Sequence, residues 1–155
     1  MDLAERLVAL MKANGTRCAT AESCTGGGIA AAITDVPGSS EVFLGGVVSY
    51  ANSVKEEVLG VSAGTLSQFG AVSSECASEM ADGARRLLKA DVAVSVTGIA
   101  GPGGGSDEKP VGLVWFGLSS PAGTHTEKAI FPGDRAAVRR AATTHALGML
   151  SAACV

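Results

Sequence analysis

Ser23 stands at a position where a nucleophile could be built. In the segment ATAESCTGGGIAAAI, residues 19–33, a carboxylate, two hydroxyls and a thiol lie between a short apolar run and three glycines. A hydroxyl at a strand-to-helix junction is presented beside backbone N–H groups that lack a helical partner, as in an oxyanion hole. In this interpretation Ser23 is a nucleophile, and the backbone N–H groups of Thr25, Gly26 and Gly27 face the substrate. In the alternative, Ser23 or Thr25 only caps the helix, and the spacing alone does not decide between the two.

A serine nucleophile needs a base, and the segment SYANSVK, residues 49–55, supplies a lysine. Lys55 falls in the first turn of a predicted helix, where the positive end of the helix dipole lowers the pKa of its amine. Tyr50 ends the preceding predicted strand and is placed to pass or orient the proton. In the alternative interpretation, Lys55 is an exposed helix residue and Tyr50 a half-buried aromatic.

Two further segments have the chemistry of an anion site. The loop TGIAGPGGG, residues 97–105 and including Gly101, offers free backbone N–H groups that form a nest for one phosphate or carboxylate. It lacks the Lys-Ser/Thr ending of a P-loop, which argues against nucleoside triphosphate hydrolysis. Arg135 and Arg139 lie four residues apart on one face of a predicted helix and could clamp an anion together. The alternative is an exposed basic stripe.

Other motifs are weak. Residues 26–31 match G-x-G-x-x-A, but no acidic residue ends the next predicted strand, as a dinucleotide site requires. Residues 60–64 match G-x-S-x-G but follow a helix, whereas a nucleophile elbow follows a strand. His125 and His145 fall on a predicted edge strand and a helix, so the spacing does not favour a Ser-His-Asp triad.

The elements that must position these residues alternate between strand and helix. The pattern predicts an α/β fold, a single-domain α/β/α sandwich with a mixed, partly antiparallel sheet. Asp2 and Glu5 fit a capping box and Gly15 ends the first helix, while Asn52 or Ser53 is expected to cap the third. Helices are predicted between Asp2 and Gly15 and over residues 25–34, 52–59, 63–69, 73–89 and 134–153, and strands over 16–21, 42–50, 91–98, 111–120 and 125–131.

Composition narrows the class of protein. With 155 residues, 46% of them hydrophobic and 17% charged, the chain is expected to form one globular domain, residues 1–155. Every apolar run is shorter than the roughly 20 residues needed to span a bilayer, and the first residues do not resemble a secretory signal. We therefore expect a cytoplasmic protein that binds no membrane. Four cysteines without a C-x-x-C pair argue for reduced core thiols and against zinc. A net charge of −3 and six aromatic residues argue against a nucleic-acid partner.

Several motifs together resemble one known family. TAESCTGG at 20–27, VSYANSVK at 48–55, SVTGIAGPGGGSDEKPVGLVWFGL at 95–118 and FPGDRAAVRR at 131–140 occur in the order found in the C-terminal domain family of the competence/damage-inducible protein CinA. The chain looks like the stand-alone form of that domain. The resemblance implies an amidohydrolase that converts nicotinamide mononucleotide to nicotinic acid mononucleotide and ammonia in pyridine-nucleotide salvage. It implies no metal and no cofactor, and it is compatible with a homodimer.

By motif position, the resemblance implies that Ser23 is the nucleophile and that Tyr50 and Lys55 act with it. It also implies that Thr97 and Gly98 lie beside the nucleotide substrate, and that Arg135 or Arg139 lies near its phosphate. Acyl transfer from the carboxamide to Ser23, with hydrolysis of the acyl-enzyme, is the expected mechanism. A non-catalytic nucleotide-binding module and a dinucleotide-dependent oxidoreductase remain as alternative functions.

Overall fold

A five-stranded mixed sheet forms the centre of the protein in a computed structural model that describes residues 1–154. The strand order is β2-β1-β3-β4-β5, in which the first three strands are parallel and β4 and β5 run antiparallel to their neighbours. The predicted mixed, partly antiparallel sheet is therefore confirmed. The strands are β1 (Cys18–Glu22), β2 (Phe43–Val48), β3 (Val92–Gly98), β4 (Leu113–Ser120) and β5 (Gly123–Ile130).

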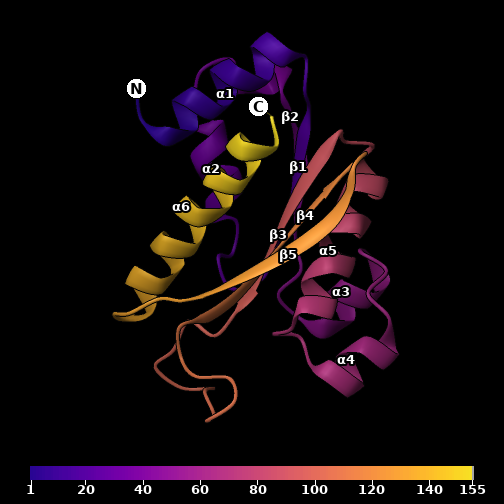
Figure 1. The fold of residues 1–155 in the computed structure, drawn as a ribbon, viewed down its shortest axis with the longest axis vertical. Coiled ribbons are helices and arrows are strands. Elements are labelled where there is room, and N and C mark those ends of the chain that lie inside the picture. The colour runs from indigo at the N-terminus through magenta and orange to yellow at the C-terminus, as the bar shows by residue number, and fades with distance from the viewer. Residues whose placement is uncertain (155) are drawn as a thin grey trace.

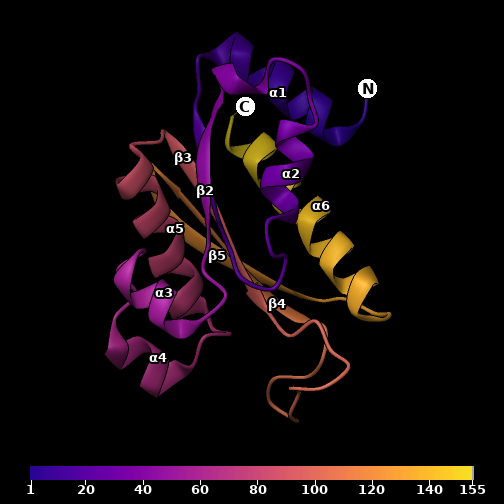
Figure 2. The same ribbon diagram turned by 180° about the vertical axis from the view of Figure 1, so that it is seen from behind.

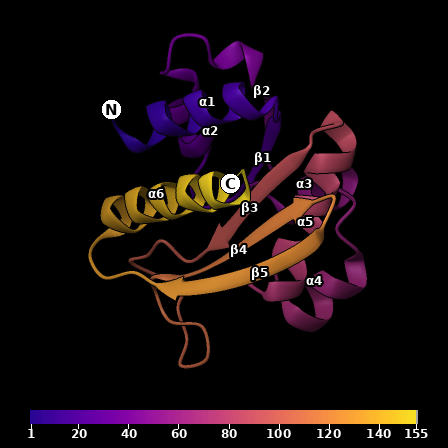
Figure 3. The same ribbon diagram turned by 45° about the horizontal axis from the view of Figure 1, so that its top comes forward.

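Helices cover both faces of the sheet, as the predicted sandwich requires (Figure 1). Figure 3 shows α1 and α6 on one side of the sheet and α3, α4 and α5 on the other. The first layer holds α1 (Leu3–Asn14), α2 (Gly28–Thr34) and α6 (Arg135–Ala153), and the second holds α3 (Asn52–Glu57), α4 (Ala63–Phe69) and α5 (Ser74–Leu88). A 3-10 turn, η1 (Ser39–Glu41), precedes β2.

Each layer buries its own apolar core against the sheet. Strand β1 is buried along its whole length, and its alternating residues supply Cys18 to the core under α1, α2 and α6 and Ala19 and Ala21 to the core under α5. Small residues on β1 let helices pack closely on both faces of the strand. The strand that leads to Ser23 is thereby fixed from both sides.

Helix ends mostly follow their predicted caps. The capping box of Asp2 and Glu5 is present and Gly15 ends α1 in the left-handed region, both as predicted, and the structure adds Asp134 as the cap of α6. The cap predicted at Asn52 or Ser53 is wrong, because α3 begins at Asn52 and its cap position is Ala51, whose side chain cannot accept a hydrogen bond. That helix begins without a side-chain cap.

The second helix also begins later than predicted. Residues 25–27 form a turn outside α2, because Gly26 and Gly27 have φ values of 59° and 102°. These left-handed conformations favour glycine and are incompatible with continuing a right-handed helix. The glycines after Ser23 therefore shape a loop, which we call the nucleophile loop (residues 23–27).

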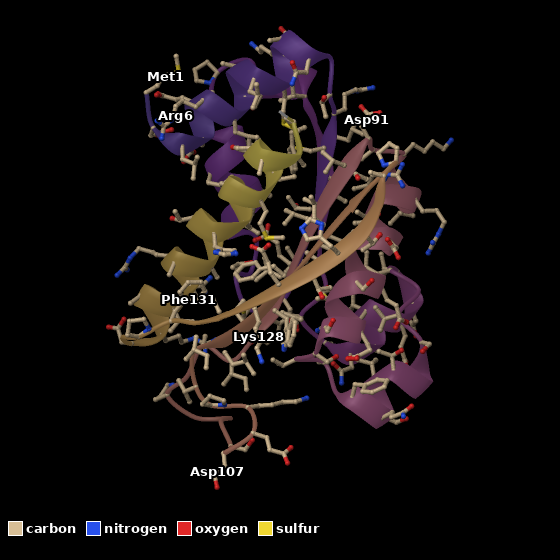
Figure 4. The ribbon with its side chains drawn as sticks, in the orientation of Figure 1. Met1, Arg6, Asp91, Asp107, Lys128 and Phe131 are labelled. Atoms are coloured by element: carbon tan, nitrogen blue, oxygen red, sulfur yellow. The ribbon has the colours of Figure 1, made fainter. Side chains whose placement is uncertain are left out.

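Parallel strands bring several loops to one edge of the sheet. The segments that follow β1, β2 and β3 leave the sheet at the same edge, and the amino end of α6 lies on that side too (Figure 2). The segment between β3 and β4 extends beyond the helices, with Asp107 near its tip (Figure 4). Open α/β sheets bind ligands at this carboxyl edge.

All four cysteines are buried and unpaired, as predicted for core thiols. Burial raises the pKa of Cys18 to about 12 and that of Cys24 and Cys76 to about 11, which keeps these thiols protonated near neutral pH. Across residues 1–154, the helices are too short or too polar for any of them to cross a bilayer.

Candidate active site

Ser23 and Lys55 meet although 31 residues separate them in the chain. Lys55 extends from α3, and its Nζ lies 3.1 Å from Ser23 Oγ. Only 1% of Lys55 and 9% of Ser23 are exposed. The structure thus places an amine and an alcohol in direct hydrogen-bond contact, shielded from solvent, at the carboxyl end of β1.

The surroundings of Lys55 favour a neutral amine. Burial lowers the pKa of the amine from its ordinary value of 10.5, against a smaller opposite effect from the thiols of Cys76 and Cys24. Its Nζ also contacts the carbonyl oxygens of Ser49 at 2.6 Å and Tyr50 at 3.1 Å. A neutral amine has two N–H bonds, so two carbonyl acceptors leave its lone pair free for the Ser23 hydroxyl proton.

Glu22 occupies the first amides of α2. Its carboxylate accepts hydrogen bonds from the backbone N–H of Ile29 at 2.9 Å and of Ala30 at 3.0 Å. It also accepts one from the Thr25 hydroxyl at 2.6 Å. The Ile29 and Ala30 amides in the first turn of α2 are therefore already hydrogen-bonded to Glu22. Backbone N–H groups that remain available to a substrate must come from the nucleophile loop.

Within that loop, the amides differ in availability. The Gly26 N–H donates to the Ser23 carbonyl at 3.1 Å and closes a tight turn. The amides of Thr25 and Gly27 find no acceptor within the described part of the chain. Thr25 is 1% exposed, so its amide is an unpaired donor in a nearly closed environment.

Arg139 contacts the nucleophile loop from α6. Its Nε donates to the carbonyl of Cys24 and its second guanidinium nitrogen donates to the carbonyl of Thr25, both at 3.1 Å. One guanidinium edge thus binds two successive carbonyls. The glycines also fit against α6, since a Cβ on Gly26 would lie 3.2 Å from Arg139 and one on Gly28 would lie 3.0 Å from the Thr143 hydroxyl.

Arg135 connects two other loops at the same edge. Its guanidinium donates to the carbonyl of Gly101 at 2.9 Å and reaches the phenol oxygen of Tyr50 at 3.4 Å. Tyr50 is 63% exposed, more than the half-buried alternative assumes, and no hydrogen bond joins its phenol to Ser23 in residues 1–154. The Lys55 amine, not the Tyr50 phenol, is the basic group in contact with Ser23.

Thr97 and Gly98 lie at the end of β3, beside β1. The Thr97 hydroxyl donates to the carbonyl of Ala71 at 2.9 Å. Gly98 has no room for a side chain, because a Cβ there would come within 2.8 Å of the Leu113 carbonyl. Both positions thus have a packing role that the sequence did not reveal.

The structure therefore brings the predicted site residues to one edge of the sheet, in two groups. Ser23, Lys55 and the nucleophile loop form one, and Tyr50, Gly101 and Arg135 form the other. Sequence reasoning gave no role to Glu22, although an acidic residue that ends a buried strand shortly before a helix is a usable signal for an amide-binding carboxylate.

A groove of about 630 Å³ lies between α1, α2 and α6, on the other side of the nucleophile loop from Lys55. Thr25 and Arg139 border it, together with Asp2 and Glu5 at the start of α1 and apolar residues of α2 and α6. It is not lined by Ser23 or Lys55, which we call the dyad, so this groove is separate from the dyad.

Comparison with known proteins gives consistent matches over nearly the whole chain. The family model described as the CinA C-terminal domain matches residues 1–154. Nicotinamide-nucleotide amidohydrolase PncC of Escherichia coli K12 is 51% identical over 151 residues, which are 97% of this chain and 92% of that protein. A putative competence-damage inducible protein of Caldanaerobacter subterraneus is 50% identical over 149 residues, but the chain spans only 36% of its length.

A solved structure shares the fold closely. The competence/damage inducible protein CihA of Agrobacterium tumefaciens superimposes with a TM-score of 0.94 at 46% identity, covering 97% of this chain and 92% of that one. The mixed sheet with helices on both faces is thus the architecture of known CinA-type proteins as well as of this chain.

Proposed function

The chain belongs to the CinA C-terminal domain family, and from that premise we propose that it is an amidohydrolase acting on nicotinamide mononucleotide. The products are nicotinic acid mononucleotide and ammonia, as in pyridine-nucleotide salvage. The name of the PncC relative, 51% identical over 97% of this chain, supports the substrate. The 3.1 Å contact between a buried lysine amine and the Ser23 hydroxyl carries the assignment of the chemistry.

In the first half of the reaction, Ser23 Oγ attacks the carboxamide carbon while neutral Lys55 takes the hydroxyl proton. The carbonyl oxygen gains negative charge, which the free amides of Thr25 and Gly27 are available to stabilise. The carbon–nitrogen bond then breaks, and the Lys55 ammonium gives its proton to the leaving group. Ammonia departs and an ester to Ser23 remains.

In the second half, water replaces ammonia. Lys55, neutral again, takes a proton from the water as its oxygen attacks the ester carbon. The bond between that carbon and Ser23 Oγ breaks, and Lys55 returns the proton to the serine oxygen. The carboxylic acid that forms gives its remaining proton to solvent and leaves as the carboxylate, with Ser23 and Lys55 in their starting states.

The second group of residues is suited to hold the nucleotide. Arg135 lies between Gly101 and Tyr50 at the open edge of the sheet, where a guanidinium can bind a phosphate. The exposed ring of Tyr50 provides an apolar surface beside it, and Thr97 and Gly98 end β3, the neighbour of β1 in the sheet. Arg135 is therefore our candidate for the phosphate contact.

An ammonia-release assay with nicotinamide mononucleotide tests the proposal. We expect the wild-type protein to release ammonia and the Ser23→Ala variant to lose at least about 10³-fold in kcat, the loss seen when a covalent nucleophile is removed. Both proteins are expected to show thermal stabilisation by the nucleotide. Stabilisation without ammonia release by the wild type would instead indicate a nucleotide-binding module, and unchanged turnover by Ser23→Ala would rule out the acyl-enzyme.

A further inference from the structure

We propose that Arg139 is a positioning residue that aims the Thr25 amide at the developing oxyanion. This inference rests on the proposed function, because an oxyanion forms only if Ser23 attacks a carbonyl. It gives Arg139 a role in the chemical step and leaves the phosphate of the substrate to other groups.

Arg139 contacts the peptide unit that joins Cys24 and Thr25. The carbonyl of Cys24 accepts from Arg139 Nε at 3.1 Å, so it points toward α6. The N–H of Thr25 belongs to the same peptide unit, which is trans, and it points in the opposite direction. The Arg139 contact thereby fixes the direction of the Thr25 amide.

That direction leads toward the dyad. Helix α6 lies on one face of the sheet and α3, which carries Lys55, on the other (Figure 3). An amide that points away from α6 thus faces the side of the loop from which Lys55 reaches Ser23. Because the amide belongs to the second residue after the nucleophile, it is near enough to meet an oxygen on the carbon that Ser23 attacks.

The second observation is that this amide has no partner. Buried backbone N–H groups are almost always paired, since an unsatisfied one keeps the full penalty of its desolvation. The Thr25 amide is nevertheless unpaired within residues 1–154, in a residue that is 1% exposed. A donor kept free in such a position is suited to a transient acceptor.

The rest of the loop is held so that this donor stays free. Arg139 also binds the carbonyl of Thr25, which turns the following Gly26 N–H toward the Ser23 carbonyl. Glu22 binds the Thr25 hydroxyl and the first amides of α2. Arg139 therefore holds the backbone carbonyls of the loop, and Glu22 holds the Thr25 hydroxyl.

The test compares Arg139→Ala and Arg139→Lys with Arg140→Ala, a matched control on the same helix whose exposed side chain makes no hydrogen bond within residues 1–154. Loss of one oxyanion donor costs about 10²–10³-fold in kcat, so a misdirected donor is expected to cost at least about tenfold. We expect Arg139→Ala to show that loss in kcat, with KM and the inhibition constant of nicotinic acid mononucleotide within about threefold of wild type. Arg139→Lys is expected to recover only part of kcat, because one ammonium cannot bind both carbonyls as the guanidinium does.

Added guanidinium ion distinguishes positioning from a general loss of structure. It is expected to raise kcat of Arg139→Ala severalfold, and to leave wild type and Arg140→Ala unchanged. An unchanged kcat in Arg139→Ala overturns the proposal, and so does a loss confined to KM and to product binding, since that pattern belongs to a phosphate ligand.

A binding measurement, which needs no turnover, tests the role of Arg139 separately from the proposed function. Pyridine-3-boronic acid forms a bond from boron to Ser23 Oγ, whose proton passes to Lys55, and the adduct carries an oxyanion-like oxygen. We expect Arg139→Ala to weaken the adduct by at least about tenfold and Arg140→Ala to leave it unchanged. If the wild type releases no ammonia, the proposed function fails, while equal adduct affinity in Arg139→Ala and wild type contradicts the role of Arg139 in either case.

Discussion

At the scale of single residues, the proposed chemistry depends on a lysine amine that is buried where its charged form is disfavoured. Lys55 is buried, and two of its three contacts are carbonyl oxygens that satisfy the two N–H bonds of the neutral form. The third contact is the Ser23 hydroxyl. In the proposed mechanism, desolvation thus keeps the Lys55 amine neutral, and the two carbonyls orient its lone pair toward Ser23.

This arrangement predicts the pH dependence of the reaction. A base works only when deprotonated, so kcat/KM for nicotinamide mononucleotide should rise with pH and level off above the pKa of Lys55 in the free enzyme. Because burial lowers that pKa, the midpoint should lie below 10.5. Lys55→Met should lose at least about 10³-fold in kcat and lose the rising limb, as measured by initial rates between pH 6.5 and 10.

Tyr50→Phe provides the comparison for that experiment. The Tyr50 phenol contacts Arg135 rather than Ser23, so we expect this variant to keep the rising limb of the profile. A Lys55→Met enzyme that retained wild-type turnover, together with a Tyr50→Phe enzyme that lost the limb, would assign the base to the phenol instead.

At the scale of elements, Glu22 joins the end of β1 to the start of α2. It replaces the side-chain cap that Gly27, at the cap position of α2, cannot provide. Glu22→Gln keeps the shape of the side chain but removes its charge and sets an NH2 group against an N–H donor. Since hydrogen bonds to charged groups contribute about 1.5–3 kcal/mol each, the free energy of unfolding should fall by about 2–4 kcal/mol in urea titrations.

An exposed acidic residue offers a matched control for this loss. Glu57 lies on the surface of α3, and Glu57→Gln should change the free energy of unfolding by no more than about 0.5 kcal/mol. Equal stabilities of the two variants would show that the carboxylate of Glu22 contributes little to holding α2.

Much of this architecture follows from local sequence signals. Asp2, Glu5 and Gly15 fix the ends of α1, and alternating or β-branched runs predict all five strands, because these features act within a few residues. The start of α2 was misplaced because helix propensity does not show that Gly26 and Gly27 adopt positive φ. Helix propensity also does not indicate that α3 lacks a side-chain cap.

The contact between Ser23 and Lys55 could be anticipated from the sequence, whereas the contacts that hold the nucleophile loop could not. Ser23 and Lys55 stand out by residue type and by their place after strands, and their contact follows from parallel pairing of β1 and β2. The role of Arg139 could not be predicted, since its two carbonyl partners lie 115 and 114 residues away in the chain. Only the packing of α6 against the nucleophile loop creates that contact.

At the scale of the whole molecule, the dyad joins the two layers of the sandwich. Lys55 belongs to the layer of α3, α4 and α5, and Ser23 leads into α2 in the other layer (Figure 1). The position of β1 between β2 and β3 lets a loop from one face meet a side chain from the other. The site therefore depends on both buried cores, and conditions that weaken either core should also affect it.

Ionisation of a core thiol is one such condition, and it gives a stability prediction at alkaline pH. Burial, with a smaller effect from Cys154, raises the pKa of Cys18 to about 12 from 9.0. Between these values the unfolded chain loses the Cys18 proton while the folded chain keeps it, so this thiol lowers the free energy of unfolding by about 1.4 kcal/mol per pH unit. Its stabilising contribution is complete below pH 9.0 and is lost as pH rises toward 12.

Comparing variants isolates that effect from the other titrating groups. Lys55 acts in the opposite sense up to pH 10.5, because its folded-state pKa is lowered, but it is present in every variant and cancels in a difference. Urea titrations from pH 8 to 10.5 should show the curve for Cys18→Ala converging on that of wild type as pH rises. Val94→Ala, which removes a buried side chain without a titrating group, should stay parallel to wild type. A Cys18→Ala curve that also stayed parallel would mean that the core admits enough water to ionise the thiol at its ordinary pKa.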